Sequence, residues 1–192
     1  GAIADAIDSY SRKTGGYLRK EDLAAYKAQW VEPITTNYRG YDVWEIPPNG
    51  HGIVVLMALN ILEGMDLSAG HDDPETAHKV MEALKLAFTD GKRYVADPRA
   101  MKPTVEQLLS RDYAAKRRAL IGSTALEPKP GTPYCGDTVY LNAADGDGNM
   151  ISYIQSIYCG FGSGTVLPGT GIVFHNRGNN FTMDETMENC VA

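Results

Sequence analysis

One short segment of the sequence has the residue types of a self-activating nucleophile. Thr138 follows the pair Gly136-Asp137 and opens a run rich in strand-forming residues. A threonine hydroxyl acts as a nucleophile when a base stands beside it. If the chain is cut between Asp137 and Thr138, the new α-amino group supplies that base, since its ordinary pKa of about 7.7–8.0 suits proton transfer near neutral pH. Taken alone, Thr138 is more simply an ordinary strand residue, and the surrounding elements decide between the two interpretations.

The residues after Thr138 predict a β-hairpin. The strand-forming run that starts at Val139 ends in the sequence Asp145-Gly-Asp-Gly-Asn149, and a second such run covers Met150 to Tyr158. Two strand-like runs joined by a glycine-containing turn are typical of a hairpin. We therefore expect Thr138 at the mouth of the first strand.

Two glycine-containing segments near the hairpin resemble ligand-binding loops in composition. Residues 145–149 resemble the start of a calcium loop, but Ser156 occupies the twelfth position, where such a loop carries glutamate. Residues 160–164 resemble a phosphate-binding loop, but the Lys and Ser/Thr pair of that motif does not follow. We expect a plain hairpin turn in the first case and a wall of a site in the second.

The chain before Thr138 predicts a mainly helical region. Helical spacing and breakers favour helices at 2–14, 22–26, 53–62, 73–94, 105–109 and 113–121, with a strand-like stretch at 33–46. In the helix at 73–94 we expect Val80, Leu84 and Phe88 to form the buried stripe. Residues 122–136 are rich in proline and small residues, which is typical of an exposed linker where chains are cut. The order of a helical part, a linker and a β-rich part predicts the α+β class.

Composition excludes several classes of function. The chain has 192 residues, enough for one or two domains, and a formal net charge of −6, which argues against nucleic acid as a partner. No run of 18 apolar residues predicts a membrane span. The three cysteines have no Cys-x-x-Cys spacing, so neither a zinc site nor a disulfide framework is predicted. The start at Gly1 lacks a basic region and an initiator Met, so we expect no signal peptide and a processed or partial chain, with the compartment left open between cytoplasm and periplasm or exterior.

Several segments in order resemble the γ-glutamyltransferase family. The resemblance lies in residues 15–26, Tyr38-Arg-Gly-Tyr41, Pro47-Pro48 and 59–63, then in Thr138, 145–149, 162–164, 169–171 and 176–181. It implies part of an N-terminal-nucleophile hydrolase, a four-layer αββα sandwich. It also implies an inactive precursor that cuts itself between Asp137 and Thr138. Residues 1–137 would then be the C-terminal part of a large subunit, and 138–192 the N-terminal part of a small subunit, in a heterodimer.

The resemblance also implies an activity and a set of site residues. The family transfers γ-glutamyl groups from glutathione and related amides to water or to an amine, without a metal or organic cofactor. Thr138 matches the nucleophile, and Ser156 matches a hydroxyl residue, usually threonine, that hydrogen-bonds the nucleophile. The change from threonine to serine keeps the hydroxyl donor and acceptor.

Three substrate-binding positions depart from the family pattern. Tyr158 replaces an asparagine that helps to hold the substrate, Arg177 replaces an acidic or amide residue, and Asn180 replaces an aspartate that receives the substrate's α-ammonium group. A cation at position 177 would repel that ammonium and attract a carboxylate. The alternative is therefore an amide acylase that acts on a non-γ-glutamyl group, such as a β-lactam side chain.

A third possibility is a catalytically silent fragment. The resemblance implies that the family's arginine for the substrate α-carboxylate precedes these residues, and that its serine pair and Gly-Gly oxyanion donors follow them. Each oxyanion donor contributes about 2.7–4 kcal/mol to transition-state binding. We expect these 192 residues by themselves to have little or no turnover.

Overall fold

The computed structural model describes residues 1–127 and 136–191, with the backbone alone for residues 136–138. The chain divides into two compact units, one formed by Gly1–Gln29 with Pro133–Asn179 and the other by Trp30–Thr132 with Asn180–Ala192. Each unit is described by itself below. The predicted division between residues 137 and 138 is a cleavage site. The packing of the two units does not test it, so it stays a prediction.

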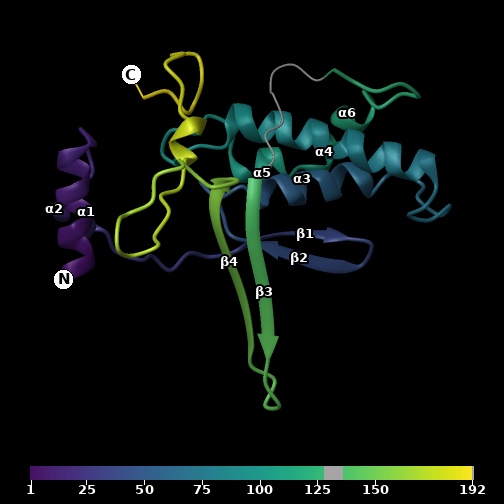
Figure 1. Cartoon of the computed structure of the whole chain (residues 1–192). Coiled ribbons are helices and arrows are strands. Elements are labelled where there is room, and N and C mark those ends of the chain that lie inside the picture. The colour runs from purple at the N-terminus through teal and green to yellow at the C-terminus, as the bar shows by residue number, and fades with distance from the viewer. Residues whose placement is uncertain (128–135, 192) are drawn as a thin grey trace. The chain divides into compact units, whose positions relative to one another are not determined.

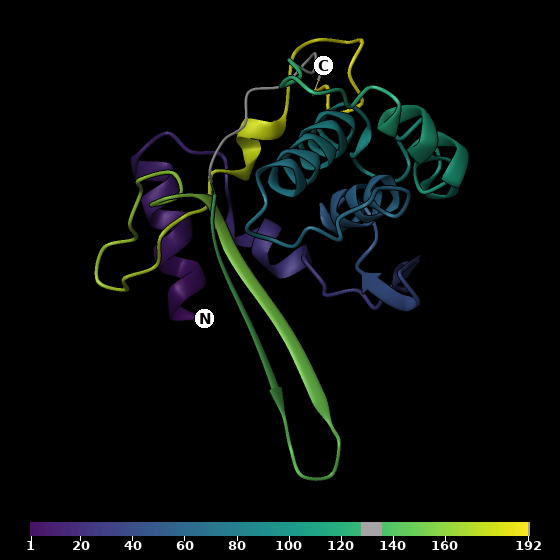
Figure 2. The same ribbon diagram turned by 90° about the vertical axis from the view of Figure 1, so that its right-hand side faces the viewer.

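The second unit is built on a pair of helices, α3 (Gly52–Leu62) and α4 (Pro74–Tyr94), which lie side by side in Figures 1 and 2. Two short helices, α5 (Val105–Leu108) and α6 (Arg111–Arg118), complete its helical part. Asp73 caps α4 by accepting a hydrogen bond from the Thr76 N–H at 2.7 Å, which confirms the start predicted from Asp73-Pro74. Within the described ranges, no helix combines the length and the apolar character needed to cross a membrane.

The buried face of α4 differs from the predicted one. Leu84 is 37% exposed and Phe88 is 51% exposed, whereas Ala83 and Ala87 are fully buried. Both stripes of α4 are apolar, so helical spacing alone does not choose between them. The two alanines let the largely apolar helix α3 approach closely, and they pack in the clusters that contain the α3 side chains. The prediction of a buried stripe through Leu84 and Phe88 was therefore wrong.

A β-hairpin packs beside this helix pair. Strands β1 (Ile34–Tyr38) and β2 (Tyr41–Glu45) are antiparallel and lie within the strand-like stretch predicted at 33–46. The turn residues Arg39 and Gly40 have φ values of +52° and +88°, and a two-residue hairpin turn of type I′ requires positive φ at both positions. The buried Asn60 of α3 accepts a hydrogen bond from Thr36 Oγ1 of β1 and donates one to the Leu109 carbonyl at 2.9 Å. This single amide joins three segments of the unit.

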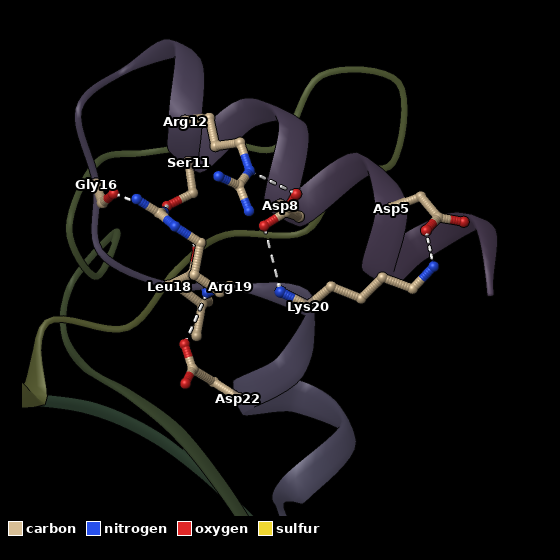
Figure 3. A network of polar contacts seen from close by, with 9 residues as sticks. All are labelled: Asp5, Asp8, Ser11, Arg12, Gly16, Leu18, Arg19, Lys20 and Asp22. Atoms are coloured by element: carbon tan, nitrogen blue, oxygen red, sulfur yellow. Dashed lines mark hydrogen bonds and ion pairs between the residues drawn. The ribbon is translucent and has the colours of Figure 1, made fainter.

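The first unit begins with two short helices, α1 (Ala2–Lys13) and α2 (Lys20–Ala25). Figure 3 shows the polar network that joins them. Asp8 accepts hydrogen bonds from Arg12 Nε at 2.9 Å and from the Lys20 N–H at 3.3 Å, and Asp22 accepts one from the Arg19 N–H at 2.8 Å. The predicted end of the first helix near Gly15 is confirmed.

The other part of the first unit is a long antiparallel hairpin, β3 (Gly136–Ala144) and β4 (Met150–Cys159), whose strands run side by side in Figures 1 and 2. In its turn, Asp145 Oδ1 accepts hydrogen bonds from the backbone N–H groups of Asp147 and Asn149 at 3.0 and 2.9 Å. The hydrogen bond from the Asn149 side chain, together with these backbone bonds, lowers the pKa of the Asp145 carboxyl group. The turn carboxylate binds its own backbone, so the predicted plain hairpin is confirmed.

The described part of the predicted linker is fastened to α4. Three polar side chains spaced by one helical turn hold residues 122–126: His78 Nε2 contacts the Gly122 carbonyl at 2.8 Å, Glu82 accepts the Leu126 N–H at 2.9 Å, and Lys85 donates to the Leu126 carbonyl. Glu82 and Lys85 also pair with each other at 2.8 Å. The rest of the linker, residues 128–135 with Cys135, lies outside the described residues.

Glu82→Gln should destabilise the second unit. The wild-type carboxylate is 3% exposed, and although burial opposes ionisation, the Lys85 ammonium and the Leu126 N–H hold its pKa below the ordinary 4.5. Loss of these charge-assisted bonds should cost about 2 kcal/mol at pH 7. A carboxyl pKa that is lowered in the folded state stabilises above its unfolded value and loses that effect as the pH falls. The difference from wild type should therefore be full above about pH 5 and shrink in more acidic solution.

Thermal melting of the full-length Thr138→Ala precursor, with and without Glu82→Gln, measures this effect. Glu75→Gln is the matched control, because Glu75 pairs with Lys79 on the same helix but is 73% exposed. Equal melting temperatures for Glu82→Gln and Glu75→Gln at pH 7 would contradict the assignment.

Candidate active site

The backbone register of the long hairpin brings two predicted site residues together. Thr138 of β3 lies opposite Ser156 of β4, and Asp137 lies opposite Tyr158. The register shifts between these two pairs, so Ile157 has no residue opposite it and forms a bulge. Bulges redirect side chains and are common beside active sites. The predicted scissile bond, Asp137–Thr138, thus faces the single irregularity that the described hairpin contains. Of the Thr138 side chain nothing is described.

The bulge forces an uncommon backbone conformation on Tyr158. Its φ of +80° lies in the left-handed region, which costs a non-glycine residue about 1–3 kcal/mol. One bond that compensates comes from Ser156, whose Oγ accepts the Tyr158 N–H at 3.0 Å. A serine Oγ that accepts this bond still carries its own O–H donor, which is the group that the predicted role of Ser156 requires.

A residue that the sequence interpretation did not single out holds the other side of the bulge. Asn176 donates its backbone N–H to the Ile157 carbonyl at 3.2 Å and accepts the Cys159 N–H on its side-chain Oδ1 at 3.1 Å. Both groups flank Tyr158 in the chain. Nothing in a single sequence marks Asn176, because its contacts depend on the bulge and on a loop of sixteen residues that returns to β4.

Arg177 lies next to this group. Its guanidinium carbon stands 5.7 Å from the centre of the Tyr158 ring, within the range of a cation–π contact. Arg177 begins a short 3-10 helix, η1 (Arg177–Asn180), which ends at Asn180. The structure therefore brings Ser156, Tyr158 and Arg177 together with the backbone of Thr138, while Asn180 belongs to the second unit. The catalytic and binding roles of these residues stay predictions.

The glycine-rich loop after β4 does not offer its amides to an anion. The N–H groups of Gly162, Ser163 and Gly164 donate to the carbonyls of Cys159, Phe174 and Phe161 at 2.7–2.8 Å. A Cβ at Gly162 would stand 2.4 Å from the Phe174 oxygen, so the loop is pressed against the segment before Asn176. A phosphate-binding interpretation is excluded, and the loop supports the segment that carries Asn176.

A hollow of about 480 Å³ lies elsewhere, within the second unit. It is lined by Thr89, Asp90, Arg93, Tyr94, Tyr113, Arg117, Asp184, Thr186 and Met187. Both arginines are already neutralised, Arg117 by Asp90 at 2.8 Å and Arg93 by Glu188. Burial raises the pKa of the Asp90 carboxyl group and of the Tyr113 phenol. No predicted site residue lines the hollow. Among the residues that the structure describes, no three His, Cys, Asp or Glu side chains gather as a metal site.

Comparison with known proteins places this geometry in context. The family model described as Gamma-glutamyltranspeptidase matches residues 1–192 of this chain. The glutathione hydrolase-like YwrD proenzyme of Bacillus subtilis (strain 168) is 38% identical over 190 residues, which are 98% of this chain and 36% of that protein. The oxamate amidohydrolase proenzyme of Klebsiella pneumoniae is 35% identical over 184 residues, which are 96% of this chain and 35% of that protein.

A solved structure is also similar over the whole chain. The cephalosporin acylase from Bacillus halodurans is 56% identical, with a TM-score of 0.86 over 100% of this chain and 35% of that chain. The likeness confirms the predicted fold class, α+β and part of an N-terminal-nucleophile hydrolase. The described residues contain two separate two-stranded sheets rather than a layered sandwich of their own. The chain spans about a third of the length of the relatives that it matches.

Ser156→Ala should slow cleavage before Thr138 in the full-length protein about tenfold or more. The alanine removes the acceptor of the Tyr158 N–H and the hydroxyl opposite Thr138, and a lost hydrogen bond of this kind corresponds to about 1–2 kcal/mol. Ser156→Thr keeps the hydroxyl and should stay near the wild-type rate. The half-time of cleavage, followed by intact mass, measures both.

The control is Ser152→Ala, four residues earlier on β4, where the hydroxyl contacts only the Tyr140 phenol among the interactions described, at 3.1 Å. Cleavage of Ser156→Ala at the wild-type rate would remove Ser156 from the site.

Proposed function

Because this chain belongs to the gamma-glutamyltranspeptidase family, we propose that the complete protein is an amide hydrolase and acyl transferase that activates itself by cutting before Thr138. The observation that carries the proposal is the register that sets Thr138 opposite Ser156 beside a bulge at the Asp137–Thr138 bond. Both relatives named above are called proenzymes, which supports processing. Processing would leave a large and a small subunit as a heterodimer.

Self-cleavage proceeds through an acyl shift within the chain. The Thr138 hydroxyl oxygen attacks the carbonyl carbon of Asp137, and its proton passes to the departing nitrogen. The Asp137–Thr138 amide bond breaks as an ester forms, which frees the Thr138 amine, and water then hydrolyses the ester to the Asp137 carboxylate and the Thr138 hydroxyl. Gly136 gives the backbone freedom that a sharp local rearrangement needs.

The mature site uses the freed amine as the base. The amine takes the hydroxyl proton, the oxygen attacks the substrate amide carbon, and the amine of the substrate leaves with a proton. An acyl ester on Thr138 remains, and water or an acceptor amine releases the acyl group. The Ser156 hydroxyl, opposite Thr138 in the register, orients the nucleophile. No metal or organic cofactor enters these steps.

The leading acyl donor is a γ-glutamyl amide such as glutathione, by analogy with the family. A second candidate is an acyl group that carries a carboxylate and no α-ammonium, as in an amide acylase. The observation that favours it is Arg177, which stands over the Tyr158 ring beside Ser156 and would attract such a carboxylate. The cephalosporin acylase and the oxamate amidohydrolase that resemble this chain support an acyl specificity beyond γ-glutamyl.

Thr138→Ala should abolish both cleavage and turnover of the full-length protein, because the alanine has no hydroxyl. Wild type should give two polypeptides whose masses add to the precursor plus one water, with the second beginning at Thr138. Intact mass and N-terminal sequencing measure the cut, and release of an aniline from an amide substrate measures turnover. One uncut wild-type mass, or a cut elsewhere, would refute the proposal.

Arg177→Gln should separate the two donor classes. If a carboxylate-bearing donor is the substrate, the loss of a charge-assisted contact should lower kcat/KM for glutaryl anilide about 10- to 100-fold and leave γ-glutamyl anilide unchanged or improved. Arg99→Gln is the control, since Arg99 is an exposed arginine that pairs only with Asp97 among the described contacts. A wild-type preference for the γ-glutamyl anilide, unaffected by Arg177→Gln, would select the leading donor instead.

A further inference from the structure

Asn176 forms hydrogen bonds to β4 in the way that a residue of a neighbouring strand would. Its backbone N–H and its side-chain Oδ1 bond the Ile157 carbonyl and the Cys159 N–H, at 3.2 and 3.1 Å. A residue of a parallel neighbouring strand would make the same pair of bonds, through its N–H and its carbonyl, to residues two apart. Asn176 supplies both from one residue, with the amide side chain standing in for a backbone carbonyl. The bonds therefore clamp the backbone on both sides of Tyr158.

The clamp lies where the hairpin register is decided. Ile157 is the unpaired residue of the bulge, and Tyr158 takes the φ of +80° that the bulge requires. Because a tyrosine disfavours this conformation, the bulge needs bonds that fix it from outside the β3–β4 ladder. The Ser156 Oγ bond to the Tyr158 N–H is one, and the two bonds of Asn176 are the others that the structure describes.

Loss of the bulge would misplace the residue before the nucleophile. Seven continuous pairs, from Thr138–Ser156 to Ala144–Met150, and the turn that follows them fix the register of Thr138, so in a regular ladder Asp137 would lie opposite Ile157 instead of Tyr158. A slip of one residue also turns the side chains of the slipped end to the opposite face. The register that the proposed function requires is thus the bulged one, and Asn176 holds it.

We propose that Asn176 is a positioning residue for self-cleavage, which keeps the β4 bulge opposite the Asp137–Thr138 bond so that Asp137 stays opposite Tyr158 while Thr138 stays opposite Ser156. This inference rests on the proposed function, because it assigns Asn176 to the reaction at the same bond. Asn176 acts through the backbone of Ile157, Tyr158 and Cys159 and does not itself touch the reacting atoms.

The test compares cleavage rates of the full-length protein by intact mass. Asn176→Ala removes the acceptor of the Cys159 N–H and should slow cleavage about tenfold. Asn176→Asp keeps an oxygen at the same place and should stay within about twofold of wild type. Asn179→Ala is the matched control, since Asn179 is an exposed asparagine three residues later, in helix η1, and the structure describes no side-chain hydrogen bond for it.

A second pair of variants distinguishes positioning from general destabilisation. Glycine adopts positive φ without strain, so Tyr158→Gly should make the bulge less dependent on the clamp. In that background Asn176→Ala should slow cleavage by no more than about twofold relative to Tyr158→Gly alone. A merely structural role would give the same tenfold slowing in both backgrounds.

The outcomes separate this inference from the proposed function. If wild type is not cut before Thr138, the proposed function fails. If wild type is cut and Asn176→Ala is cut at the same rate, the proposed function stands and the positioning role of Asn176 is refuted. An equal slowing in the Tyr158→Gly background would also refute it.

Discussion

The pairing of Thr138 with Ser156 across the β3–β4 hairpin is the constraint on which the rest of the site depends. The turn and the seven continuous pairs from Ala144–Met150 to Thr138–Ser156 fix this register. Beyond Thr138 the register shifts by one residue, and a bulge at Ile157, a left-handed Tyr158 and the side chains that bond them hold that shift. The proposed reaction therefore depends on the hairpin register as well as on the types of side chain at the site.

The second unit depends on close helix packing and on an ion pair that binds backbone groups. Its core is a helix pair in which Ala83 and Ala87 of α4 admit the apolar helix α3. The same helix presents Glu82 and Lys85 to the backbone of Leu126, twelve residues before Thr138. An ion pair that holds both the N–H and the carbonyl of Leu126 fastens this residue to α4.

The sequence predicted the elements whose signals are local. The Asp145–Asn149 turn and the Asp73-Pro74 cap define a hairpin and a helix start through bonds within a few residues, so their prediction needed no tertiary information. The buried stripe of α4 was wrong because two apolar stripes compete, and the partner helix chose the one with small residues. The left-handed conformation of Tyr158 could not be predicted from the sequence, because a tyrosine gives no sign of a positive φ. The role of Asn176 could not be predicted either, because its contacts depend on the bulge beside Tyr158.

In the proposed reaction, chemistry and specificity rest on different parts of this geometry. The proposed nucleophile Thr138 and its partner Ser156 are placed by the backbone of one hairpin, which any residue at positions 158 and 177 leaves intact if the bulge is held. The charge near the proposed acyl group would come instead from Arg177, at the start of η1, whose described side-chain contact with the hairpin is with the Tyr158 ring. A change at these outer positions can exchange an ammonium-bearing donor for a carboxylate-bearing one without disturbing the register. That separation accounts physically for a family in which proteins called glutathione hydrolases and acylases have similar chains over the same hairpin.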